Sequence, residues 1–319
     1  MIPIHAILRL TSILVVVLIR WFCSSAEDEV VWVAIVMSLG LGHYLLAIVY
    51  SQRQIIQSFS QPASAVPLLI LLLLGSTLYL PVIGAARVLP TYRQIVLLFF
   101  FGLHHVFNEV FLTSRLITPQ HYARTWLYRT NGVVLHLLLY FFLLRNDPIL
   151  RLTFYDISLE SARHLVNALF AGLIVSYLVF FFSLYQMRRY LRGARWIDAC
   201  AFELGAVALI VISFGRYRFE FLDIVCYHFI FWVIYPATKL WSQGRGPLLR
   251  YVLWTVALTG GLLLVSPIGV VPYKYGLDRP SFYSEQFTLW SFIHITGSFA
   301  MSNANPWWIV RWFRPRAAW

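Results

Sequence analysis

The sequence is short of charge: charged residues make up 12% of its 319 residues, while hydrophobic residues make up 60%. Soluble globular domains contain about 25% charged and about 45–50% apolar residues. A chain with so little charge cannot cover a water-facing surface, and no stretch is long enough and polar enough for a separate soluble domain. We therefore expect a single transmembrane helical domain over residues 1–319, all-α and embedded in the lipid bilayer.

Acidic residues and cysteines are also scarce. The chain has 13 Asp and Glu against 25 Lys and Arg, for a formal net charge of +12. The basic residues collect in short loops beside apolar runs, where they orient a membrane protein, so we expect no nucleic-acid partner. Cys23, Cys200 and Cys226 lie in or beside apolar runs without CxxC spacing. The sequence therefore predicts neither a disulfide nor a zinc-thiolate site.

The sequence has no glycine-rich phosphate loop, so no water-soluble nucleotide cofactor is expected. It also shows no internal repeat and no low-complexity tail. The first apolar run carries Arg9 and Arg20 and has no small-residue cleavage site before Glu27. We therefore expect this run to remain in the protein as its first helix rather than to be removed as a signal peptide.

The sequence does contain many apolar runs close to the roughly 20 residues that cross a hydrocarbon core about 30 Å thick. Segment 24–29 is acidic, whereas four basic clusters fall on one side if the N-terminus is cytoplasmic; Arg87 and Arg93 run against this pattern. We predict about ten transmembrane helices, both termini cytoplasmic, in a multi-pass protein of a bacterial inner (cytoplasmic) membrane. The predicted spans are 7–22, 30–50, 65–85, 94–115, 131–144, 164–186, 196–214, 219–240, 251–271 and 287–312.

The fourth predicted span carries four polar residues where lipid would be the solvent: His104, His105, Asn108 and Glu109. An ionisable side chain near the bilayer centre costs roughly 2.5 kcal/mol or more unless it is paired, wetted or bound to a metal. At helical pitch His105 and Glu109 are four residues apart, as are His104 and Asn108, so both pairs can point into one cavity.

The predicted topology puts His43, His104, His105, His228 and His294 at one depth, with His136 and Glu203 in the lower part of the same slab. One such histidine alone would most simply be an interhelical hydrogen bond. Five at one depth beside a carboxylate favour a metal site, and imidazoles without thiolates suit iron, copper or zinc.

Two alternatives remain open for these histidines. Haem could lie between facing imidazoles, with His43 opposite His105 or His228 opposite His294. A proton or ion path would also use intramembrane His and Glu. Pro236, Pro267 and Pro306 lie within or near apolar runs, where a broken helix needs protein or water to satisfy the freed carbonyl. The segment 303–306 is the favoured place for such a break, close to the cytoplasmic end of the cavity.

Four segments, taken in order, resemble the membrane β-carotene 15,15′-dioxygenases of the Brp/Blh group. Residues 40–46 resemble the family's early Gly-Leu-Pro-His helix, and residues 103–109 resemble its second histidine helix. Residues 202–205 followed by 225–229 are similar to its late pair of helices, and His294 falls in a final histidine-bearing helix. The chain departs from the family where Gly42 replaces a proline and where Trp232 stands four residues after His228 in place of a second histidine.

The resemblance implies a membrane-embedded, histidine-ligated iron (Fe²⁺) dioxygenase acting on a carotenoid or another long apolar lipid taken from the bilayer. His43, His104, His228 and His294 would hold the metal, with His105 and Glu109 assisting catalysis as a fifth ligand or as groups that orient the ligands. The alternatives are a non-enzymatic membrane subunit or scaffold of a larger complex, with membrane protein partners and with or without bound haem, and an ion- or proton-coupled transporter.

Overall fold

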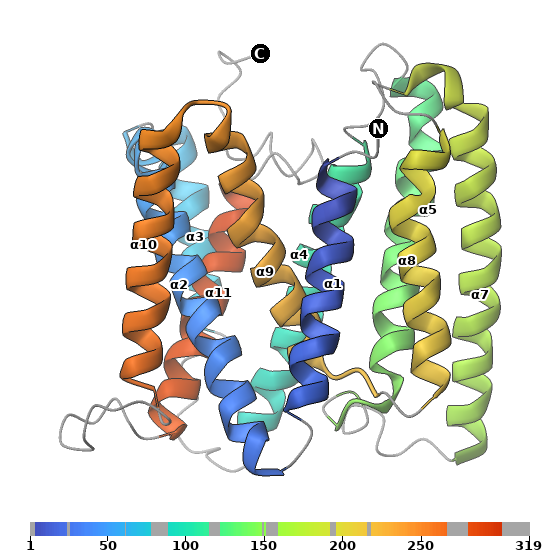
Figure 1. The fold of residues 1–319 in the computed structure, drawn as a ribbon, viewed down its shortest axis with the longest axis horizontal. Coiled ribbons are helices and arrows are strands. Elements are labelled where there is room, and N and C mark those ends of the chain that lie inside the picture. Colours follow the sequence, from blue (N-terminus) through green and yellow to red (C-terminus); the bar gives the residue numbers. More distant parts are fainter. Residues whose placement is uncertain are drawn as a thin grey trace. The chain divides into compact units, whose positions relative to one another are not determined.

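In the computed structural model the described residues are helical and contain no strand (Figure 1). Within the described residues, each of the ten predicted spans overlaps one long helix, while residues 78–85, 115, 267–271 and 302–312 of these spans lie outside the described residues. The described residues are 4–23, 26–60, 62–77, 89–114, 122–148, 150, 159–191, 196–215, 218–266 and 280–301. The long helices are α1 (Ile4–Phe22), α2 (Ala26–Phe59), α3 (Pro62–Thr77), α4 (Leu89–Ser114), α5 (Tyr122–Leu143), α7 (Leu159–Gln186), α8 (Trp196–Phe214), α9 (Phe221–Trp241), α10 (Arg245–Leu264) and α11 (Pro280–Met301).

Helix boundaries differ from the predicted spans mainly where polar residues continue the helix. The fifth span, predicted as the short segment 131–144, is a helix of 22 residues that begins at Tyr122. Helix α2 is 34 residues long and ends at Phe59, well past the predicted residue 50. Hydropathy detects only the part of a helix that matches the hydrocarbon, whereas backbone hydrogen bonding continues beyond it.

Five of the described helices contain segments long and apolar enough to cross a membrane: Val30–Arg53, Ile95–Leu112, Glu160–Gln186, Phe221–Trp241 and Arg245–Leu264. Helix α10 presents most of its apolar side chains outward, and Leu253 and Val256 are 60% and 65% exposed. Such a continuous apolar surface is unusual on a soluble monomer but is expected against lipid. The described residues therefore form an all-helical fold that contains several candidate membrane-spanning helices.

Packing groups the described residues into two compact units, and each is treated by itself. Unit 1 comprises α1 through Leu10 together with α4, α5, α7 and α8, and unit 2 comprises α1 from Thr11 together with α2, α3, α9, α10 and α11. The expectation of one domain over residues 1–319 stays a prediction.

In unit 1, α5 packs against both α4 and α7. The Tyr140 hydroxyl on α5 donates to the Leu98 carbonyl of α4 over 2.8 Å. Just beyond the end of α5, Arg145 donates to the carbonyl of Ser213 at the end of α8 over 2.6 Å. These bonds fix α5 against its neighbours and so fix the depth of the polar residues that it carries.

In unit 2, α2 packs against α3, α10 and α11. A Cβ atom on Gly40 would lie 2.5 Å from ring carbons of Phe229 and Phe287, so a glycine there lets α2 approach α9 and α11 closely. Pro236 does not break its helix, because α9 continues through this residue to Trp241. The Val233 carbonyl, in the turn before the proline, accepts a 2.7 Å hydrogen bond from the Tyr251 hydroxyl. The break expected at 303–306 lies outside the described residues.

Candidate metal centre

Three of the four histidines predicted as ligands come together in unit 2. His43 on α2, His228 on α9 and His294 on α11 each offer one ring nitrogen, and these nitrogens all lie within 4.8 Å of one another. His228 is 2% exposed, and the other two are half-buried. We call these residues the histidine trio. Helices far apart in the sequence thus converge on one point, as the sequence predicted for these three.

Contacts between aromatic rings fix the orientation of the imidazoles in the trio. The His43 ring centroid lies 4.9 Å from that of His294 and 5.9 Å from that of His228, with interplanar angles of 66° and 90°. Phe229 packs beside the site, with its centroid 5.6 Å from His43. Tilted and edge-on contacts of this kind are the preferred aromatic geometries. They limit how far each imidazole can rotate.

A hydrogen bond between Tyr44 and Ser291 ties α2 to α11 next to the trio. The Ser291 hydroxyl donates to the Phe287 carbonyl over 2.7 Å, which uses its only proton. The Tyr44 hydroxyl, 2.8 Å from Ser291 Oγ, must therefore be the donor in the bond between them. Tyr44 follows His43 in the sequence, and Ser291 lies one turn before His294. The bond thus fixes the register of the two ligand-bearing helices.

The donor set fits a metal ion of intermediate hardness. Three imidazoles with no thiolate and no carboxylate in the group suit iron, copper or zinc. Nitrogens bound to one ion at about 2.0–2.1 Å lie roughly 3–4 Å apart. The nitrogens of the trio, which lie within 4.8 Å of one another, would have to move slightly closer together to bind one ion. Three protein ligands also leave coordination positions open, as in catalytic rather than structural sites.

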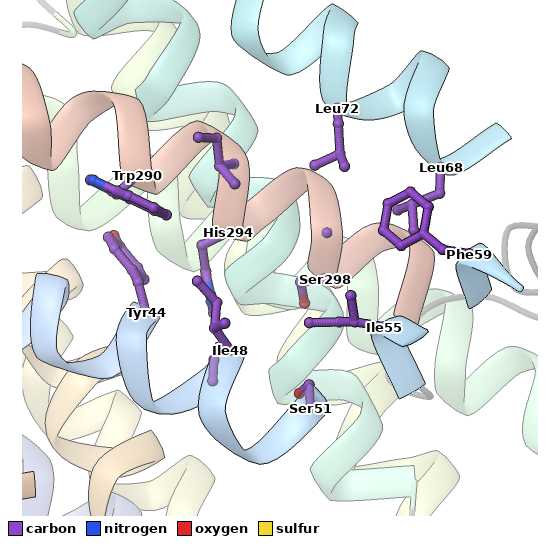
Figure 2. Close-up of a pocket in the computed structure, with 13 residues that line it drawn as sticks. Tyr44, Ile48, Ser51, Ile55, Phe59, Leu68, Leu72, Trp290, His294 and Ser298 are labelled. Carbon is purple, nitrogen blue, oxygen red and sulfur yellow. The ribbon is translucent and has the colours of Figure 1, made fainter. Parts of the chain in front are cut away.

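A pocket of about 440 Å³ adjoins the trio, formed by α2, α3 and α11 (Figure 2). His294 is part of its wall, and Figure 2 shows Tyr44 and Trp290 at one end and Leu68 and Phe59 at the other. Most of the wall is apolar, which suits a hydrophobic ligand. The lining residues are Tyr44, Ala47, Ile48, Ser51, Ile55, Phe59, Leu68, Leu72, Trp290, Ile293, His294, Gly297 and Ser298.

The fourth predicted ligand, His104, belongs to unit 1 and is not a member of the trio. Its Nε2 lies 3.1 Å from the Asn108 side-chain nitrogen, the contact expected from their spacing of four residues. His105, predicted as a catalytic group, stacks on Phe101 with ring centroids 5.9 Å apart. The roles of His104 and His105 at a metal stay predictions.

Glu109, the other predicted catalytic group, forms a buried ion pair with Arg9 of α1. Arg9 also donates to the Glu109 backbone carbonyl over 3.0 Å, and the two side chains are only 1% and 2% exposed. The sequence interpretation used Arg9 only as an argument against a signal peptide and missed this partner. The signal was present, since a lone arginine inside an apolar run needs a buried counter-charge.

His136 and Glu203, predicted at similar depth, do meet: His136 Nε2 lies 3.5 Å from Glu203 Oε1. Both belong to unit 1 and neither belongs to the trio. His164, which the sequence left out of the site, is 74% exposed.

No protein-family model matches the sequence, and no curated protein and no solved structure matches it. The resemblance to the Brp/Blh group therefore stays a prediction that depends on the motifs in the sequence and on the convergence of the histidine trio.

Proposed function

We propose that the chain is a membrane-embedded, histidine-ligated iron oxygenase that acts on a carotenoid or another long apolar lipid. One observation carries this proposal: His294 belongs both to the histidine trio and to the wall of an apolar pocket. A metal held by the trio would therefore lie beside a bound hydrophobic chain. Metal and substrate sites that share a residue are expected of an enzyme rather than of a structural metal site.

The iron would supply the oxygen chemistry, because a histidine-bound ferrous ion with open coordination positions can bind and activate dioxygen. The residues of the chain do the remaining work. Phe229 and the other imidazoles hold each ligand ring in place. The bond from Tyr44 to Ser291 keeps α2 and α11 in register. The apolar wall of the pocket binds a hydrocarbon chain and excludes water from it.

Haem fits the trio less well than a single ion. Two axial imidazoles must stand on opposite faces of a flat macrocycle, with their coordinating nitrogens about 4 Å apart and the plane between them free. Here a third imidazole lies within 4.8 Å of the other two nitrogens. A macrocycle centred between any two of these histidines would collide with the third.

The proposed enzyme has about ten transmembrane helices and cytoplasmic termini, and we place it in a bacterial inner membrane. The acidic segment 24–29 and the basic clusters of the sequence support this orientation. Reporters fused after Trp319 and within segment 24–29 should report opposite sides of the membrane. If both report the same side, the proposed span count or orientation is wrong.

The proposed chemistry is tested on the purified protein in lipid nanodiscs. We expect about one iron per chain with no Soret band, and oxygenated or cleaved products when the protein is given a polyene lipid and dioxygen. Ile48→Trp, which fills the pocket, should keep the iron and lose the turnover. A Soret band, or iron-loaded protein that converts none of a panel of apolar lipids, would overturn the oxygenase and favour an anchor or scaffold.

A further inference from the structure

A second buried polar site lies in unit 1 and uses none of the trio. His136 on α5 is 4% exposed and Glu203 on α8 is 0% exposed, and His136 Nε2 lies 3.5 Å from Glu203 Oε1. The described residues offer no hydrogen-bond partner to His136 Nε2 or to either carboxylate oxygen of Glu203. A charged carboxylate at the centre of a membrane helix costs on the order of 2.5–3.5 kcal/mol unless another group compensates its charge.

The tautomer of His136 is fixed by its other nitrogen. His136 Nδ1 lies 2.8 Å from the Gly132 carbonyl oxygen, one turn earlier on α5. A carbonyl can only accept, so Nδ1 must carry a hydrogen. If the ring were neutral, Nε2 would present a lone pair to Glu203. If the carboxyl were also ionised, two lone pairs would face each other in a buried site.

We propose that His136 and Glu203 form a proton-binding site within unit 1, in which one proton is held between His136 Nε2 and the Glu203 carboxylate. The proton converts two facing acceptors into a donor and an acceptor, and it neutralises the buried negative charge. The pair then has net charge zero whichever of the two groups carries the proton.

The neighbouring groups named below do not neutralise the charge of Glu203. Glu109 of α4 and Arg9 of α1 both act electrostatically on His136, but these two residues neutralise each other in their own ion pair. Among the described residues, His105 of α4 interacts electrostatically with His136, and Cys200 of α8 and Tyr177 of α7 interact with Glu203. None of these neighbours supplies a spare positive charge to Glu203.

Tyr177 on α7 gives the site a route for proton exchange. Its hydroxyl is buried with no hydrogen-bond partner among the described residues, and Glu203 acts on it electrostatically. A hydroxyl donates and accepts at once, so it can pass a proton to or from the carboxylate through a bridging water. A bound metal is the less favoured occupant, because the described residues place no third His, Cys, Asp or Glu in metal-ligand range of the pair.

Nitrogen NMR of ¹⁵N-histidine-labelled protein, with infrared spectroscopy of the same nanodisc samples, tests this site. At neutral pH the wild-type chain should show either a buried imidazolium or a protonated carboxylic acid, one per chain. Glu203→Gln should abolish that signal and leave His136 neutral, since a glutamine amide donates to Nε2 without an extra proton. The matched control is Glu160→Gln, which alters the exposed i,i+4 pair with His164 on α7 and should leave the signal unchanged.

Three outcomes would overturn the proposal. A wild-type spectrum with His136 neutral and Glu203 ionised would show that the pair holds no proton, and this measurement needs no variant. A His136 imidazolium that persists in Glu203→Gln would show that the proton does not depend on the carboxylate. Metal that remains in the His43→Ala variant and is lost from His43→Ala/Glu203→Gln would show that the occupant is a metal ion.

Discussion

The two units differ in how their buried polar side chains are grouped. In unit 1 they occur in complementary pairs: Arg9 with Glu109, His104 with Asn108, and His136 with Glu203. Unit 2 contains one such pair as well, Arg20 with Asp223, but its trio brings together three side chains of the same kind, with no carboxylate in the group. The first two pairs are neutral as they stand, and the third becomes neutral when it holds one proton, whereas three converging imidazoles present nitrogens that one cation can share. We expect the pairs of unit 1 to keep buried charges compensated, and the trio of unit 2 to bind a metal ion.

The largest expected effect is on metal content, and it tests whether binding belongs to unit 2 alone. His228→Ala removes the most buried member of the trio and should abolish stoichiometric metal binding, since two imidazoles rarely hold an ion at a catalytic site. Elemental analysis of purified protein measures the loss.

His104→Ala is the matched variant in unit 1, and it decides the role of the fourth predicted ligand. If the trio alone holds the metal, this variant should keep it. Equal loss of metal in His104→Ala and His228→Ala would break the contrast between the two units and support the ligand set predicted from the sequence.

The next effect is on stability and concerns the charged pair of unit 1. Arg9→Leu leaves Glu109 buried without its counter-charge and should lower the free energy of unfolding by about 3–5 kcal/mol. The double variant Arg9→Leu/Glu109→Leu removes both charges and should recover most of that loss. Denaturation in detergent compares the two, and a double variant no more stable than Arg9→Leu would show that the pair does not compensate itself.

A smaller effect is expected from close packing beside the trio. Gly40→Ala would bring a methyl group against the rings of Phe229 and Phe287, and overpacking of this kind costs about 1–3 kcal/mol. Because Phe229 contacts His43, metal affinity should fall as well. Gly261→Ala on α10 is the control: nothing lies near its added methyl group, so the variant should be as stable as the parent or up to about 1 kcal/mol more stable.

The smallest effect concerns the bond between Tyr44 and Ser291. Tyr44→Phe removes a single hydrogen bond and should cost about 0.5–1.5 kcal/mol in stability. A double-mutant cycle with Ser291→Ala isolates the interaction, and a coupling energy of zero would show that it does not join the two ligand-bearing helices.

The sequence predicted the helices well because hydropathy records which side chains face lipid. It predicted the meeting of His43, His228 and His294 because helices of alternating direction place residues at calculable depths. It could not predict the partner of Glu109, because depth alone does not show which helices are neighbours. Nor did it show whether the helix that contains Pro236 is continuous, as α9 is.

The ion pair of Arg9 also has a consequence for how the chain is made. Its two members are separated by 100 residues in the sequence. At synthesis rates of about 5–20 residues per second, Arg9 is synthesised roughly 5–20 s before Glu109. During that interval an arginine in a lone apolar helix disfavours insertion by about 2.5–3.5 kcal/mol. If α1 spans the membrane as the sequence predicts, we expect its stable insertion to be a late event of biogenesis that depends on the arrival of α4.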